Sequence, residues 1–165
     1  MKVLVVDDDP SVRESVSKVL NAAGYESLLA ADGEEALAQF DSNEIALLVL
    51  DLGLPIKNGW DVFERITREN PLLPIVIITG QVEQYDVAVA AGVGALMEKP
   101  LDALQLLHTI RELLAEPAEV RLHRLCGHGG SVRHIPSGSA LFLKQLREQY
   151  EKLFSSERPQ VRKLA

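Results

Sequence analysis

The stretch LVVDDDP, residues 4–10, joins a short apolar run directly to three carboxylates. The apolar run is typical of a buried strand, and Asp9-Pro10 is typical of a helix cap followed by proline at the first helical position. Like charges this close repel each other, and the end of a buried strand is an unfavourable place for them. The stretch therefore predicts that Asp7 and Asp8 are brought to a site where positive charge offsets their own.

Short apolar runs alternate with helical patterns over the first 115 residues. We predict five strands, at residues 2–6, 25–30, 46–50, 75–79 and 95–97. We predict five helices, at residues 10–23, 34–40, 59–69, 82–91 and 101–115. Continuously apolar strands suit a parallel sheet that is covered on both faces. The regular alternation predicts an α/β fold with a doubly wound parallel sheet.

The charge divides the chain into two parts. Residues 1–115 contain 8 lysines and arginines against 19 aspartates and glutamates, whereas residues 116–165 contain 9 against 5. We predict a domain over residues 1–116, a linker or irregular segment over 117–138, and a C-terminal helix with a basic tail over 139–165. Apolar residues at helical spacing in this last helix favour docking on the first domain slightly over pairing with a second chain; they are Leu143, Leu146, Tyr150 and Leu153.

Composition limits where this protein works. No apolar run approaches the roughly 20 residues that a membrane span needs. The N-terminal residues lack a secretory pattern, because acids follow a very short apolar run. Cys126 is the single cysteine, which excludes an internal disulfide framework. A cytoplasmic location without membrane contact is the expected one.

Reactive side chains follow four of the predicted strands. In doubly wound sheets the functional site lies beyond the carboxyl ends of the strands. Five residues stand there: Asp7, Asp8, Asp51, Thr79 and Lys99. Converging carboxylates favour a bound Mg²⁺, which prefers carboxylate and water oxygens. Asp51 can act as a nucleophile for phosphoryl transfer, while the Lys99 ammonium offsets charge on the transferred group.

Four motifs together resemble the receiver domain of two-component response regulators, over about residues 1–116. They are VVDDD at 5–9, DLGLP…G at 51–59, ITG at 78–80 and EKP at 98–100. The resemblance implies a flavodoxin-like fold with five parallel strands in the order 2-1-3-4-5, followed here by a C-terminal helical extension.

The resemblance also implies roles for individual residues. Asp7 and Asp8 resemble the acidic metal pair, with Asp8 the more direct ligand, and Asp51 resembles the phosphoacceptor. Three further correspondences complete the site: the Gly53 carbonyl as the backbone metal ligand, Thr79 as the switch hydroxyl and Lys99 as the phosphate-contacting lysine. The Lys99-Pro100 peptide bond is expected to be cis.

Leu96 departs from the family pattern. Many receivers carry Tyr or Phe three residues before the lysine, where the ring swings inward when the hydroxyl moves. Leucine at this position means that the usual aromatic rotamer switch is absent. Signal output through the fourth helix, fifth strand and fifth helix is therefore in question.

The implied function is that of a phosphorylation-dependent response regulator. A sensor histidine kinase or phosphotransfer protein would transfer a phosphoryl group to Asp51 in a Mg²⁺-dependent step, and the modified chain would act on a downstream protein target. Such a domain is not an enzyme in the ordinary sense, although it assists its own phosphotransfer and dephosphorylation. Formation of a homodimer stays open.

Two alternatives are kept. The first is a transcription regulator whose basic tail binds DNA, although a helix-turn-helix needs two packed helices and the tail offers one. The second is a nonphosphorylated interaction module, which Leu96 favours and the intact set of site residues opposes.

The segment predicted as a linker also raises the question of a zinc site. Its four nitrogen and sulfur ligands match no standard zinc-finger spacing, which favours ordinary histidines in a glycine-rich segment; they are His123, Cys126, His128 and His134.

Overall fold

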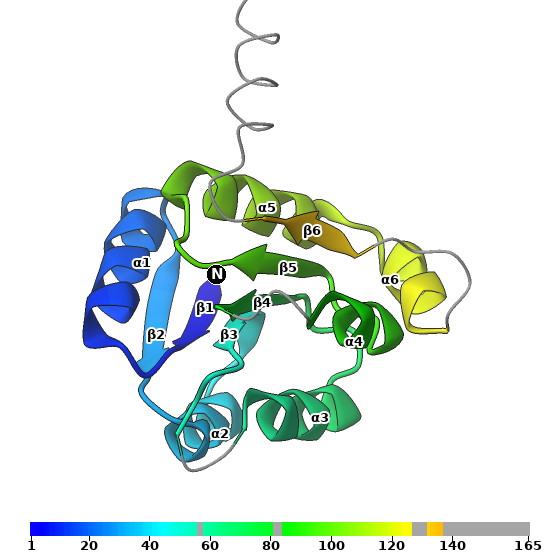
Figure 1. The fold of residues 1–165 in the computed structure, drawn as a ribbon, viewed down its shortest axis with the longest axis horizontal. Helices are drawn as coiled ribbons and strands as arrows, with labels where there is room; N and C mark the ends of the chain where they lie inside the picture. The colour runs from blue at the N-terminus through cyan, green and yellow to red at the C-terminus, as the bar shows by residue number, and fades with distance from the viewer. Residues whose placement is uncertain (56–57, 81–83, 127–131, 137–165) are drawn as a thin grey trace, which may run out of the picture.

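Six parallel strands form one sheet in the computed structural model, which describes residues 1–55, 58–80, 84–126 and 132–136 (Figure 1). Their order is β2-β1-β3-β4-β5-β6, so the predicted order of the first five strands is confirmed. The strands are β1 (Lys2–Val6), β2 (Glu26–Ala30), β3 (Ile45–Asp51), β4 (Ile75–Thr79), β5 (Ala95–Glu98) and β6 (Arg133–Ile135).

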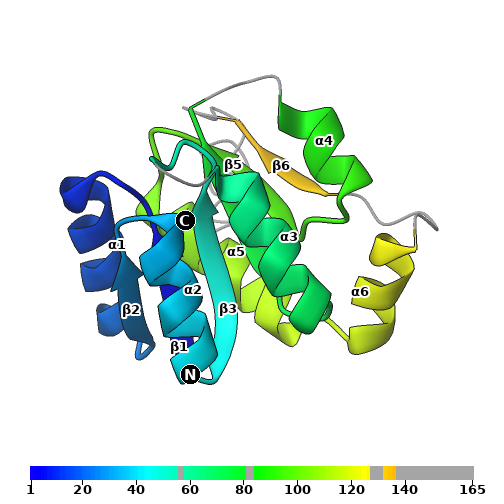
Figure 2. The same ribbon diagram turned by 90° about the horizontal axis from the view of Figure 1, so that it is seen from below.

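Helices cover both faces of the sheet (Figures 1 and 2). α1 and α5 pack on one face, and α2, α3 and α4 pack on the other. Their bounds are α1 (Pro10–Ala22), α2 (Gly33–Ser42), α3 (Gly59–Glu69), α4 (Tyr85–Ala90), α5 (Ala103–Ala115) and α6 (Ala118–Leu125). Within the described part of the chain, every helix falls short of the length and apolar character that a membrane span requires.

The alternation of side chains along β1 explains why its sequence is apolar throughout. Val3 and Val5 point into a core formed with α1 and α5, while Leu4 and Val6 point into the core formed with α2 and α3. A strand that is buried on both faces has no position for a polar side chain until it ends. The first polar side chain after Lys2 is therefore Asp7, which directly follows β1 at the carboxyl edge of the sheet.

Side-chain caps fix the starts of the helices next to this edge. Asp9 accepts a hydrogen bond from the Ser11 N–H at 2.8 Å, as predicted. Asp102 accepts one from the Gln105 N–H at 2.9 Å, which makes α5 begin two residues later than predicted. α4 begins at Tyr85, and residues 82 and 83 of the helix predicted at 82–91 lie outside the described residues.

The structure corrects the prediction of a five-stranded sheet. β6 adds a sixth strand beyond β5, and it comes from the stretch predicted to be a linker or irregular segment. β6 has only three residues and two of them are polar, so its sequence carries no apolar run. The helix predicted at about 139–154 and the basic tail lie outside the described residues.

α6 lies in the same stretch and is anchored mainly by charge. Arg124 is 7% exposed, and its two terminal nitrogens donate to the Glu116 carboxylate at 2.8 Å each. Its Nε donates to the Gly92 carbonyl at 3.3 Å. Because hydrophobic periodicity reports apolar stripes and not ion pairs, the pattern did not reveal this helix.

Candidate functional site

The parallel sheet brings the predicted site residues to one edge. Asp51 ends β3 and Thr79 ends β4, whereas Asp7 and Lys99 directly follow β1 and β5. The register places Asp51 beside Ile78, and Thr79 beside Glu98. The backbone continues this alignment beyond the strands, since the Lys99 N–H donates to the Thr79 carbonyl at 2.8 Å.

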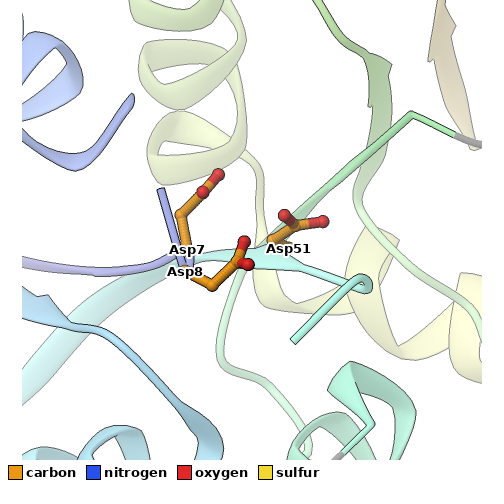
Figure 3. Close-up of side chains that lie close together, drawn as sticks. All are labelled: Asp7, Asp8 and Asp51. Carbon is orange, nitrogen blue, oxygen red and sulfur yellow. The ribbon is translucent and has the colours of Figure 1, made fainter. Parts of the chain in front are cut away.

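Three carboxylates meet at the centre of this edge (Figure 3). Asp7, Asp8 and Asp51 each offer an oxygen, and these oxygens lie within 4.8 Å of one another. Asp7 and Asp51 are buried, whereas Asp8 is exposed. The cluster therefore has a buried base and one open side through which an ion or a phosphoryl group can enter.

Lys99 provides the positive charge that the sequence calls for. Its Nζ lies 2.6 Å from Oδ2 of Asp51 and 2.8 Å from Oδ2 of Asp7. Burial disfavours the ammonium, but the hydrogen bonds to Asp51 and Asp7 outweigh this, so the pKa of Lys99 is raised above its ordinary value. Lys99 is thus held as a cation between two carboxylates.

Asp7 is the most enclosed carboxyl of the cluster, with no exposed surface. Burial raises its pKa above the ordinary value, although the hydrogen bond from Lys99 acts in the opposite direction. Its Oδ1 accepts from the Asp9 N–H at 2.9 Å. Its backbone is fixed as well, because Nη1 of Arg13 donates to its carbonyl at 2.6 Å. Sequence reasoning missed Arg13, which lies one turn into α1 and carries no motif.

Asp51 is oriented by the loop that follows it. Its Oδ1 accepts from the Gly53 N–H at 2.9 Å, while its Oδ2 faces Lys99. Gly59 closes the same loop: its N–H donates to the Leu52 carbonyl at 3.3 Å. A Cβ on Gly59 would lie 2.4 Å from the Asp51 carbonyl oxygen, so this position has room only for glycine. The backbone of α3 therefore starts directly against the backbone of Asp51.

The remaining predicted residues lie where the sequence argument puts them. Thr79 is 2% exposed at the end of β4, and the Lys99-Pro100 peptide bond is cis. Leu96 is buried in β5, with its Cα paired to that of His134 in β6. A groove of about 590 Å³ opens beside Lys99, between α1 and the start of α5, and its walls include Val12, Val16 and Leu106.

The possible zinc ligands do not form a group among the described residues. The cluster of candidate metal ligands found there is Asp7, Asp8 and Asp51, whereas His123, Cys126 and His134 belong to no such cluster. His128 lies outside the described residues. His134 instead has Nε2 at 2.8 Å from Oε1 of Glu98.

The acidic cluster has the chemistry of a site for a hard divalent cation. Three carboxylates face one ammonium group, so the ionised cluster keeps an excess of negative charge. Carboxylate oxygens are the ligands that Mg²⁺ prefers, and the open side at Asp8 leaves room for the waters that this ion retains. The residues present therefore fit a magnesium ion.

The sequence and the fold match known proteins. Residues 3–111 match the family model of the response regulator receiver domain. The chain is 36% identical over 125 residues to the DNA-binding response regulator MtrA of Mycolicibacterium smegmatis, covering 72% of this chain and 54% of that protein. It is 30% identical over 171 residues to the uncharacterized transcriptional regulatory protein YcbL of Bacillus subtilis, covering 96% of this chain and 75% of that protein.

Solved structures of response regulators share the fold of this chain. A response regulator from Chloroflexus aurantiacus has a TM-score of 0.66 at 34% identity, covering 70% of this chain and 98% of that one. A CheY-like receiver domain protein from Methanospirillum hungatei has a TM-score of 0.65 at 30% identity, covering 68% and 92%. This chain spans about half the length of MtrA and of the PhoP protein of Bacillus subtilis, another relative, so only the receiver part of those proteins is compared.

Proposed function

Because the chain belongs to the response regulator receiver domain family, we propose that it is a phosphorylation-dependent response regulator of a two-component signalling system. Asp51 accepts the phosphoryl group from a sensor histidine kinase or a phosphotransfer protein. The phosphorylated chain then acts on a downstream protein target. The observation that carries this proposal is the position of Lys99, whose Nζ bridges Asp51 and Asp7 at the edge of a three-carboxylate cluster.

The transfer is a displacement at phosphorus. A carboxylate oxygen of Asp51 forms the new P–O bond as the P–N bond to the donor histidine breaks, and the electron pair of that bond stays with the histidine nitrogen. The Gly53 N–H and Lys99 hold the Asp51 carboxylate from two sides, which limits its orientation before the donor arrives. The Lys99 ammonium then shifts from the carboxylate to the phosphoryl oxygens, and the Thr79 hydroxyl donates to another of them.

Receiver domains generally bind Mg²⁺ at an acidic pocket. In this chain Asp7, Asp8, Asp51 and the Gly53 carbonyl would hold it, with Asp8 on the open side. A bound magnesium ion supplies positive charge to the phosphoryl oxygens during transfer. Arg13 donates to the Asp7 carbonyl and the Asp9 N–H donates to the Asp7 carboxylate, so both the backbone and the side chain of Asp7 are held in position.

Mass spectrometry of the intact chain tests the proposal. Incubation with acetyl phosphate and Mg²⁺ is expected to add one phosphate, and peptide mapping is expected to place it on Asp51. Omission of Mg²⁺ should slow the uptake strongly, because the excess carboxylate charge then repels the donor. A chain that takes up no phosphate under these conditions contradicts the proposal and favours a nonphosphorylated interaction module.

Magnesium binding provides a separate test. In calorimetric titrations we expect one Mg²⁺ site, and Asp8→Ala should weaken it by at least about tenfold, since even the partners of metal ligands contribute that much. Asp9→Ala is the matched control, because Asp9 caps α1 through Ser11 and does not belong to the cluster. Equal affinities of the two variants would remove Asp8 from the site.

The pH dependence of magnesium binding follows from Asp7. Protons and Mg²⁺ compete for the same carboxylate, and burial raises the pKa of Asp7. Acidification should therefore weaken Mg²⁺ binding from a pH above the ordinary pKa of an aspartate, and binding should recover when the pH rises again.

DNA binding is a second candidate function, because several relatives are described as DNA-binding or transcriptional regulators. MtrA is described as DNA-binding, and PhoP and YcbL as transcriptional regulatory proteins. In this chain the candidate would depend on the basic residues 137–165, which lie outside the described residues. A salt-sensitive, sequence-selective gel shift would favour it over action on a protein target.

A further inference from the structure

β6 lies next to the strand that delivers Lys99 but outside the part of the chain that matches the family model, which ends at residue 111. It lies beside β5 (Figure 1) and pairs with it in parallel. Arg133, His134 and Ile135 lie opposite Ala95, Leu96 and Met97. This edge of the sheet is therefore closed by the chain's own C-terminal region.

His134 contacts both the end of β5, next to Lys99, and the start of α4, which follows Thr79 along the chain. Its Nε2 lies 2.8 Å from Oε1 of Glu98, the residue before Lys99. Its ring centroid lies 5.0 Å from that of Tyr85, the first residue of α4, six positions after Thr79. The Tyr85–His134 ring pair therefore joins β6 to the start of α4.

β6 is attached less firmly than the strands beside it. None of its three residues is buried, whereas every residue of β4 is. Val132, just before it, packs in the core on the α2–α4 face, and Arg133 forms partly exposed ion pairs with Glu112 and Glu116. Short edge strands with few buried contacts open at a lower free energy than central strands. Loss of one contact can therefore shift β6 between a docked and a released state.

The order of the strands determines whether a movement of Thr79 is directed toward β6 or away from it. β4 lies between β3 and β5, so a Thr79 hydroxyl that moves toward a phosphoryl group on Asp51 moves away from β6. A movement of Thr79 would carry the start of α4, six residues further along the chain, in the same direction. Tyr85 then separates from His134, and the docked state of β6 loses one of its contacts.

We propose that phosphorylation of Asp51 releases β6 from β5 through the Tyr85–His134 contact, which makes β6 the element that passes the signal to the C-terminal region. The proposal rests on the proposed function of Asp51. In this proposal the Tyr85–His134 ring contact beside β5 breaks when Asp51 is phosphorylated. The chain thus has an aromatic contact that responds to phosphorylation, although Leu96 itself carries no ring.

Hydrogen exchange of the full chain, with and without acetyl phosphate in the presence of Mg²⁺, tests the proposal. We expect the amides of residues 133–135 to exchange at least about fivefold faster after phosphorylation, the lower end of a typical coupling between two sites. The amides of β2, the edge strand on the opposite side, should not change. Intact mass of the same samples measures phosphate uptake.

Two variants identify the route. In Tyr85→Ala, β6 should exchange fast before phosphate is added, and phosphorylation should change it by less than about twofold. Tyr85→Phe keeps the ring and should behave like the natural chain. Absence of phosphate uptake would contradict the proposed function. Phosphate uptake with unchanged exchange of β6, or a full response in Tyr85→Ala, would overturn the release of β6 by this route.

Discussion

Asp51→Asn will abolish the uptake of phosphate from acetyl phosphate and Mg²⁺. An amide oxygen or nitrogen is a poor nucleophile for phosphorus compared with a carboxylate, so the acyl phosphate does not form. The substitution keeps the shape of the side chain and its acceptor for the Gly53 N–H, so the loop should keep its conformation. Intact mass spectrometry over the time course of the natural chain measures the effect, and we expect no phosphorylated species above background.

Asp41→Asn is the matched control for this loss. It makes the same chemical change at an exposed position near the end of α2. This end of α2 precedes the start of β3 and lies near the amino ends of the strands, whereas Asp51 lies at their carboxyl ends. Its uptake should equal that of the natural chain. If Asp51→Asn still gained one phosphate at the natural rate, the phosphoryl group would be going elsewhere and Asp51 would lose its assigned role.

Gly59→Ala will cause the largest loss of stability among single-methyl additions near the site. The new Cβ would lie 2.4 Å from the Asp51 carbonyl oxygen and 2.7 Å from the Leu52 Cα, and both of these are backbone atoms. Backbone cannot rotate away as a side chain can, so β3 and α3 must separate. We expect the free energy of unfolding to fall by about 3 kcal/mol, the upper part of the range for overpacked cores. Urea denaturation followed by circular dichroism measures it.

Gly80→Ala serves as the comparison. A Cβ at this position has no atom within 4 Å, so the free energy of unfolding should change by less than about 0.5 kcal/mol. Equal stability of the two variants would show that the contact between the Gly59 and Asp51 backbones is not tight in solution.

The sequence predicted those parts of the fold whose signal is apolar and local. β1 and β4 were placed to the residue, because runs buried on both faces end sharply at Asp7 and Gly80. α3 was also placed to the residue, since Asn70-Pro71 ends it; the structure shows in addition that Asn58 caps its start. The sequence did not predict α6 and β6, because the contacts that hold them involve partners distant in sequence. Arg124 contacts Gly92, and His134 contacts Glu98.

The candidate site was predictable in its members but not in its contacts. Parallel strands bring their carboxyl ends to one edge, so a strand assignment is enough to group Asp7, Asp51 and Lys99. Which oxygen Lys99 contacts, and that it contacts two carboxylates at once, depends on rotamers that no spacing encodes. Arg13 shows the same limit, because its target is a backbone carbonyl and any residue could supply that group.

The parallel direction of β6 decides where the chain continues. An antiparallel sixth strand would have ended beside the amino ends of the other strands, but β6 ends at Ile135 beside Met97, two residues before Lys99. The sixth strand therefore returns the chain to the edge of the sheet that carries Asp7, Asp51 and Lys99.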